Sequence, residues 1–228
     1  ATGYFASDSD LPFHAPDFTK ISEADYIPAF EQGMAIHSAE VRTIIANSDA
    51  PTFENTIVAL EKSGAVLGRV SSIFFQLTGT NTTDGLDAIN TEISPKLTSH
   101  GDSITLNPDL FARVKAVYEN RANLGLDVED TKLLERTYNT MVHAGALLTD
   151  EQREQVKAIN SKLSTMTTEF GQMARDAMAD QPLIVDTREE LAGMSDSDIQ
   201  AAAKFAEELG QPGKFAIALQ NTTQQPLI

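Results

Sequence analysis

The residues of this sequence that could carry acid–base or metal chemistry at neutral pH are its four histidines, His14, His37, His100 and His143. Two histidines four residues apart share one helical face and form the usual start of a zinc site, but no two of these have that spacing, and cysteine is absent. His37 falls within an apolar stripe, so we expect a hydrogen-bonded packing residue there, whereas His100 and His143 are expected at helix ends or in solvent. The sequence therefore predicts no catalytic, cofactor-binding or metal-binding residue in this chain.

Acidic residues are numerous but do not form a recognisable site. The tetrapeptide SDSD occurs at 7–10 and at 195–198, and neither copy continues into a calcium loop with its central Gly and closing Glu. The second copy is more simply a helix cap followed by acids at the positive end of the helix dipole. Among the many pairs of carboxylates, the sequence selects none as a catalytic acid and base. A calcium-binding module is therefore disfavoured.

Gly64 and Gly68 form a Gly-x-x-x-Gly pattern within a predicted helix. Neither belongs to a phosphate-binding loop, because no Gly-Lys-Ser/Thr follows and the context is helical. We expect these glycines to allow close packing of a second helix.

The charge balance limits the possible partners. The chain of 228 residues has 17 Lys and Arg against 33 Asp and Glu, a net charge of -16. Binding to nucleic acid or to an anionic membrane surface needs concentrated positive charge, so neither is expected as a partner. No apolar run reaches the roughly 18 residues that a membrane-spanning helix needs.

The elements that must position these residues are mainly helices, because apolar residues recur at helical spacing over most of the chain. We predict a mainly α fold with an irregular segment at 1–21, an antiparallel helical bundle or array at 22–180, and the start of a small α/β element at 181–228. Helix starts are predicted by Ser22 with Asp25 as a capping box, by Asn107 followed by a proline, and by Thr149.

Two long helices are expected to be central to the core. One runs from Thr52 to Leu77, with apolar residues on two faces of its second half. The other follows Thr149 and repeats apolar residues at alternating steps of three and four, so we expect its methionines to fill the core. This stripe consists of Val156, Ile159, Leu163, Met166, Phe170, Met173 and Ala177. Between the two helices, Pro95 is expected to kink or interrupt a third.

Two short strands are predicted beyond residue 181, at 183–185 and 214–219, with a helix capped at SDSD between them and ending at Gly210. An isolated strand pair is marginal in water, so we expect more sheet downstream and predict that the closing stretch ALQNTTQQPLI lies inside a larger architecture. The start at Ala1, without Met, is interpreted as either signal-peptide removal or an engineered boundary. A periplasmic location is predicted, with the cytoplasm as the alternative.

Several segments, in order from about Leu11, resemble one protein family. They are LPFHAPDFTKISEADYIPAFEQGM, PTFENTIVALEKSGAVLGRVSSIFFQLTGTNTTDGLDAINTEISPKL, LNPDLFARVKAVYEN, LLERTYNTMVHAGALL and ALQNTTQQPL. Together they are similar to the amino-terminal region of bacterial peptidyl-dipeptidases, in the thimet-oligopeptidase and oligopeptidase A family of zinc metallopeptidases. The resemblance implies a helical enzyme with a deep channel and a zinc ion on a His-Glu-x-x-His helix far towards the carboxyl end. That motif is absent here, so no catalytic or metal residue is carried over.

The resemblance leads to one hypothesis and one alternative. The first is the non-catalytic amino-terminal part of a zinc peptidase that releases carboxyl-terminal dipeptides from short peptides, with helices that wall and roof the channel. Its partners would be the carboxyl-terminal catalytic part of the same protein and short peptide substrates. Zinc would bind outside these residues, and this chain alone is predicted to be inactive. The alternative is a free-standing acidic helical module for protein interaction.

Overall fold

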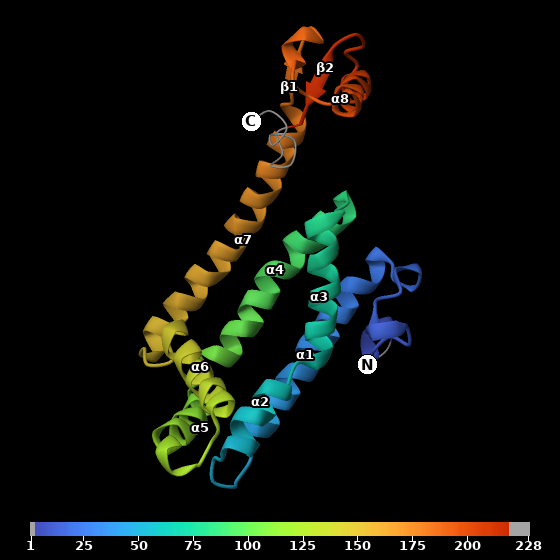
Figure 1. The fold of residues 1–228 in the computed structure, drawn as a ribbon. Helices are drawn as coiled ribbons and strands as arrows, with labels where there is room; N and C mark the ends of the chain where they lie inside the picture. The colour runs from blue at the N-terminus through green and yellow to red at the C-terminus, as the bar shows by residue number, and fades with distance from the viewer. Residues whose placement is uncertain (1–2, 219–228) are drawn as a thin grey trace. The chain divides into compact units, whose positions relative to one another are not determined.

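The computed structural model describes residues 3–218, without the side chains of residues 179 and 180. The chain divides into two compact units, Ala1–Thr168 and Glu169–Ile228. The fold is mainly α-helical, as predicted. The first unit contains α1 (Tyr26–Ile45), α2 (Ala59–Lys62), α3 (Ala65–Thr80), α4 (Asp84–Thr105), α5 (Pro108–Glu119), α6 (Val128–Ala144) and the start of α7 (Asp150–Asp180), as Figure 1 shows. The second unit contains the rest of α7, β1 (Leu183–Val185), α8 (Asp196–Glu208) and β2 (Phe215–Ile217).

Helix starts follow the predicted capping chemistry. The Ser22 backbone N–H donates to Asp25 Oδ2 at 2.8 Å, which forms the predicted capping box before α1. Asn107 Oδ1 accepts two backbone N–H groups at the start of α5, and Thr149 exchanges hydrogen bonds with Gln152 at the start of α7. Each cap satisfies donors that the first helical turn leaves free, so these helix ends can be read from local sequence.

Two apolar cores hold the first unit together. One lies between the first half of α1, α3 and α4, where Phe30 and Phe74 are fully buried and their rings meet edge to face. The other joins the end of α1 to α5 and α6, around Leu110 and Leu134. Helices α1 and α3 lie side by side (Figure 1), and Gly33 lets the backbone of α3 approach: a Cβ at Gly33 would lie 3.0 Å from Leu67 Cα.

The prediction of one continuous helix from Thr52 to Leu77 is wrong. The chain forms a π-helical segment, Phe53–Val58, then the short α2, and turns at Ser63 and Gly64 before α3 begins. Gly64 has φ +75°, a left-handed conformation that glycine adopts without steric cost. The prediction of close helix packing at Gly68 is also wrong, because Gly68 is exposed and a Cβ there would meet no atom within 4 Å.

Pro95 does not interrupt α4, which runs from Asp84 to Thr105 through it. A proline removes one hydrogen bond of the helical ladder, and the flanking turns retain theirs.

The segment before α1 is irregular but attached. Phe5 is buried, and Arg69 of α3 donates to the Phe5 carbonyl oxygen at 2.8 Å and to Asp8 Oδ1 at 3.0 Å. The predicted irregular start of the chain is therefore tied to the packed face of α3.

The second unit contains the two predicted strands, which pair antiparallel with Ile184 opposite Ala216. Helix α8, capped by Ser195 as predicted, packs with them around Ile199 and Val185. The second strand is shorter than predicted, since it covers Phe215–Ile217. Residues 219–228, with most of the closing stretch ALQNTTQQPLI, lie outside the described residues.

Candidate functional site

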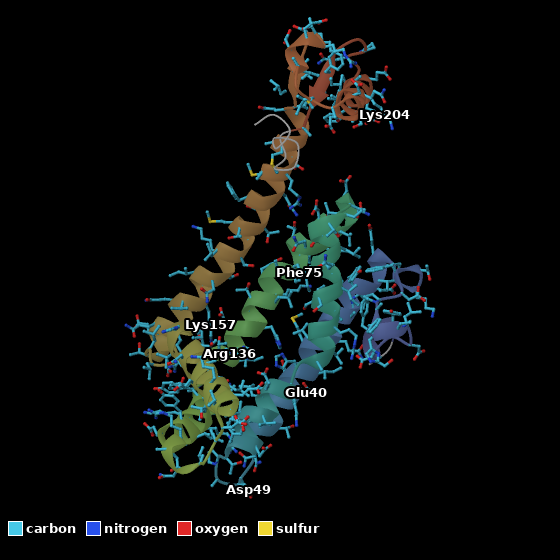
Figure 2. The ribbon with its side chains drawn as sticks, viewed as in Figure 1. Glu40, Asp49, Phe75, Arg136, Lys157 and Lys204 are labelled. Carbon is cyan, nitrogen blue, oxygen red and sulfur yellow. The ribbon has the colours of Figure 1, made fainter. Side chains whose placement is uncertain are left out.

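The apolar stripe of α7 is at the surface, so the prediction that it fills the core is wrong. Its large side chains are each more than half exposed: Ile159, Leu163, Met166, Phe170 and Met173. Of the side chains described on α7, residues 150–178, none is buried. Figure 2 shows side chains projecting from this helix along its length, from near Lys157 onwards. We call the three of these residues that belong to the first unit, Ile159, Leu163 and Met166, the α7 face.

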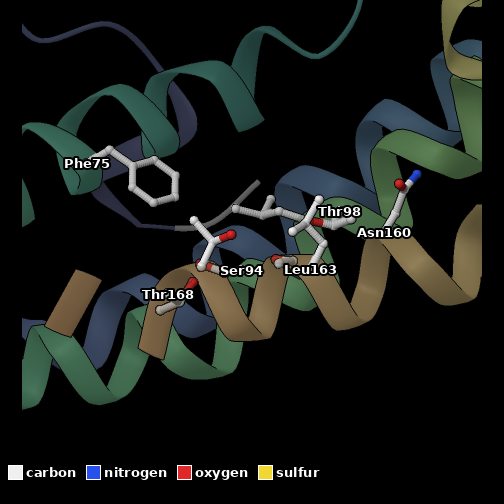
Figure 3. A pocket seen from close by; sticks show the side chains of 9 residues that line it. Phe75, Ser94, Thr98, Asn160, Leu163 and Thr168 are labelled. Atoms are coloured by element: carbon white, nitrogen blue, oxygen red, sulfur yellow. The ribbon is translucent and has the colours of Figure 1, made fainter. Parts of the chain in front are cut away.

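Part of the α7 face borders a groove of about 550 Å³ within the first unit. Its walls come from α3, α4 and the first half of α7, and Figure 3 shows the Phe75 ring on the opposite side of the groove from Ser94 and Thr168. The lining combines three apolar side chains with hydroxyls and one amide: Phe75, Leu97, Leu163, Ser94, Thr98, Ser164, Thr167, Thr168 and Asn160. Hydroxyls and an amide can hydrogen-bond to peptide groups without a net charge, and none of the described residues that line this groove is charged.

A polar contact between Asn160 and Asp102 connects α7 to α4 beside the groove. Asn160 Nδ2 donates to both carboxylate oxygens of Asp102, at 2.9 and 3.1 Å. Asp102 is buried, so the amide offsets part of the desolvation of its carboxyl group. Sequence reasoning did not select the groove. The available signal was the helical spacing of Asn160, Ser164 and Thr167, beside Leu163 on the same helix.

The histidines are placed partly as predicted. His143 is exposed in the last turn of α6, as expected, and His14 is exposed in the segment before α1. His37 is a half-buried, hydrogen-bonded packing residue of α1, also as expected. The expectation for His100 is wrong: it is half-buried in α4, with its Nε2 3.0 Å from His37 Nδ1. The two residues are distant in sequence, so only the packing of α4 on α1 brings them together.

Burial lowers the pKa of both rings. For His37 the desolvation of the charged form is the larger effect, and the nearby Glu40 carboxylate opposes it. For His100 desolvation is again the larger effect, and the neighbouring His37 lowers its pKa further. Burial therefore favours the neutral form of both rings.

The described residues do not provide a zinc site. Within residues 3–218, no three His, Cys, Asp or Glu side chains are grouped so that they could hold a metal ion. The His37–His100 pair supplies two nitrogen atoms, one fewer than the protein ligands of a catalytic zinc. Among the helices described, none has the length and apolarity needed to cross a membrane.

Comparison with known proteins shows similarity along nearly the whole chain. It is 41% identical over 224 residues to dipeptidyl carboxypeptidase of Escherichia coli (strain K12), an alignment that covers 98% of this chain and 33% of that protein. The dipeptidyl carboxypeptidase of Salmonella typhimurium is 38% identical over the full 228 residues, which are 34% of its length. The resemblance to the peptidyl-dipeptidase and oligopeptidase A family is confirmed.

The oligopeptidase A branch of this family is more distant. Oligopeptidase A of Escherichia coli is 23% identical over 196 residues, which cover 86% of this chain and 29% of that protein. No protein-family model matches the chain. The chain spans about a third of the length of the curated relatives it matches.

Proposed function

We propose that this chain is the non-catalytic amino-terminal part of a zinc metallopeptidase that releases dipeptides from the carboxyl end of short peptides. The observation that carries the proposal is the extent of the match: 98% of this chain aligns with 33% of a dipeptidyl carboxypeptidase. The name of that relative supports the type of reaction. Zinc and its ligands would belong to another part of the polypeptide, because the described residues do not fit the ion.

The exposed α7 face supports a role as one part of a larger assembly. Leu163 is 58% exposed and Met166 is 54% exposed, and contiguous apolar surface of this kind usually marks an interface. We propose that the rest of the polypeptide covers this face. The helices of the first unit would then wall and roof a channel that admits short, unstructured peptides.

The α7 face also favours one alternative, a free-standing helical module that binds a separate protein. The two proposals differ in what must accompany the chain. The peptidase proposal requires a His-Glu-x-x-His helix in the same polypeptide, whereas the interaction module requires none.

The test is a peptidase assay on the full-length polypeptide and on residues 1–228 alone. With an amino-blocked tripeptide as substrate, we expect the full-length polypeptide to release the carboxyl-terminal dipeptide and to lose activity when a chelator removes the metal. Residues 1–228 should show no hydrolysis and no stoichiometric zinc by elemental analysis. Chelator-sensitive hydrolysis by residues 1–228, or a full-length polypeptide without peptidase activity, would overturn the proposal.

A further inference from the structure

We propose that His37 and His100 act as one proton-binding unit, which takes up a single proton on the side of α4 and thereby weakens the junction of α1, α4 and the Ser63–Gly64 turn. The junction is built on three contacts: His100 Nε2 with His37 Nδ1 at 3.0 Å, His37 Nε2 with Ser63 Oγ at 3.2 Å, and the Gly64 backbone N–H with Glu40 Oε2 at 2.7 Å. The proposed proton uptake does not depend on peptidase activity.

The direction of each hydrogen bond follows from the hydroxyl of Ser63. This hydroxyl has one proton and donates it to the Leu60 carbonyl oxygen at 2.6 Å. Ser63 Oγ must then accept from His37, so the neutral His37 ring carries its proton on Nε2 and leaves Nδ1 as an acceptor. His100 therefore donates from Nε2 to His37 Nδ1. Both rings are assigned to the Nε2–H tautomer, and Nδ1 of His100 is left without a proton.

The first proton can bind at His100 with these hydrogen bonds intact, so it weakens the junction by placing a charge on a half-buried ring and not by removing a contact. Nδ1 of His100 has no hydrogen-bond partner among the described residues, and His100 borders a hollow of about 630 Å³ that also touches Ser99 and Ser103. A proton bound there leaves Nε2–H free to donate to His37 as before. It can also be shared with His37, whose cationic form would be nearer the Glu40 carboxylate.

A second proton cannot bind without breaking the junction. It would have to occupy His37 Nδ1, the atom that accepts from His100, and it would place two cations next to each other, with ring centroids 5.0 Å apart and ring planes inclined by 60°. Interacting groups of this kind titrate as a pair rather than as two independent sites.

The charges around the pair come from α1 and α4. Glu40 on α1 acts on His37, and the two rings act on each other. Glu31 of α1 and Lys96 of α4 also border the hollow beside His100, and they are paired with each other at 3.1 Å. The turn contributes the neutral Ser63. The local carboxylates are thus too few to offset the burial of an imidazolium.

The sign of the effect on stability follows from the lowered pKa of each ring. Between the folded pKa and the ordinary value of about 6.5, the unfolded chain binds more protons than the folded chain. The contribution of the neutral pair to the free energy of unfolding is therefore fully present above about pH 6.5, and it decreases as the pH falls below that value. The junction holds α4, which carries one wall of the groove, so acidification is expected to loosen that wall.

The first experiment uses the chain itself, with ¹⁵N-labelled histidine, in an NMR titration from pH 8 to pH 5. We expect the Nε2–H tautomer for both rings at pH 8, and one coupled transition below pH 6.5 that adds a single proton to the pair. Independent titration of His37 and His100 near pH 6.5, each to full protonation in the folded chain, would overturn the proposal.

The second experiment compares urea-unfolding midpoints at pH 7 and pH 5. We expect the wild-type midpoint to be lower at pH 5 than at pH 7. The double variant His37→Gln/His100→Gln should lose most of this decrease, since two glutamine amides cannot be protonated in this range. The matched control, His143→Gln, should retain the wild-type fall. An equal fall in all three proteins would contradict the inference, and the NMR titration of the wild type decides it if the double variant does not fold.

Discussion

Helices α1 and α7 carry the same kind of apolar pattern in very different surroundings. On α1, Tyr26 and Phe30 are buried against α3, with at most 1% of each side chain exposed. On α7, Phe170 is 72% exposed and Ile159 is 63% exposed, although their spacing is as regular. The comparison teaches that an apolar stripe specifies a helix and the face that needs covering, whereas it does not specify which part of the molecule covers it.

The largest expected effect compares one phenylalanine from each helix. Phe30→Ala should lower the free energy of unfolding by about 3–5 kcal/mol, because it leaves a cavity against Phe74 in a fully packed core. Phe170→Ala should change it by less than about 0.5 kcal/mol, because that ring is already in water. Urea titration of both variants measures the difference. Similar losses would mean that α7 is packed in this chain and that the comparison is wrong.

A second pair compares a buried arginine with an exposed one. Arg113 donates to the Asn47 carbonyl oxygen at 2.7 Å and to Asn55 Oδ1 at 3.1 Å, and it fixes the segment between α1 and α2. Arg113→Met should cost about 2–3 kcal/mol, because it removes the hydrogen bonds that a buried, charged guanidinium donates. The control is Arg136→Met on α6, where the ion pair to Glu61 is 3.6 Å long and largely exposed, and about 0–1 kcal/mol is expected. Equal costs would show that the burial of Arg113 contributes nothing to stability.

The smallest expected effects are those of alanine at two glycines, Gly64 in the turn before α3 and Gly68 within α3. Gly64→Ala should destabilise the chain by about 1–2 kcal/mol, because φ is +75° and the new Cβ would lie 3.0 Å from the His37 ring. Gly68→Ala should stabilise it by about 0.5–1 kcal/mol, because Gly68 is helical and nothing lies within 4 Å of the new Cβ. Thermal melts of the two variants should move in opposite directions. Melting-temperature shifts of the same sign would show that the turn before α3 is assigned to the wrong residues.

Local chemistry in the sequence predicts much of this fold. The caps at Ser22, Asn107, Thr149 and Ser195 depend on residues within one helical turn, and the structure places each helix start at or within four residues of its cap. The strand at Leu183–Val185 is likewise predicted from β-branched and apolar residues beside a proline. Features that depend on a few neighbouring residues can be read from the sequence alone.

Features that depend on distant residues could not be predicted. His100 meets His37 from 63 residues away, so no spacing in the sequence reveals the pair. The groove requires α4 and α7 to lie together, and its hydroxyl groups resemble ordinary surface residues until both helices are placed. The turn at Gly64 could not be predicted because the apolar stripe continues through it at helical spacing, although the left-handed conformation of this one residue ends the helix.

The central claim is that the rest of a longer polypeptide covers the α7 face, and one variant measured in two contexts tests it most directly. In residues 1–228 alone, Leu163→Asp should change the free energy of unfolding by less than about 0.5 kcal/mol, because Leu163 is 58% exposed. In the full-length polypeptide the same change would bury a carboxylate in an apolar interface, and a loss of about 2–4 kcal/mol is expected. Ser161→Asp, at an exposed position on the same helix, adds the same charge and should be nearly neutral in both contexts. A Leu163→Asp effect as small in the full-length polypeptide as in residues 1–228 would contradict the account.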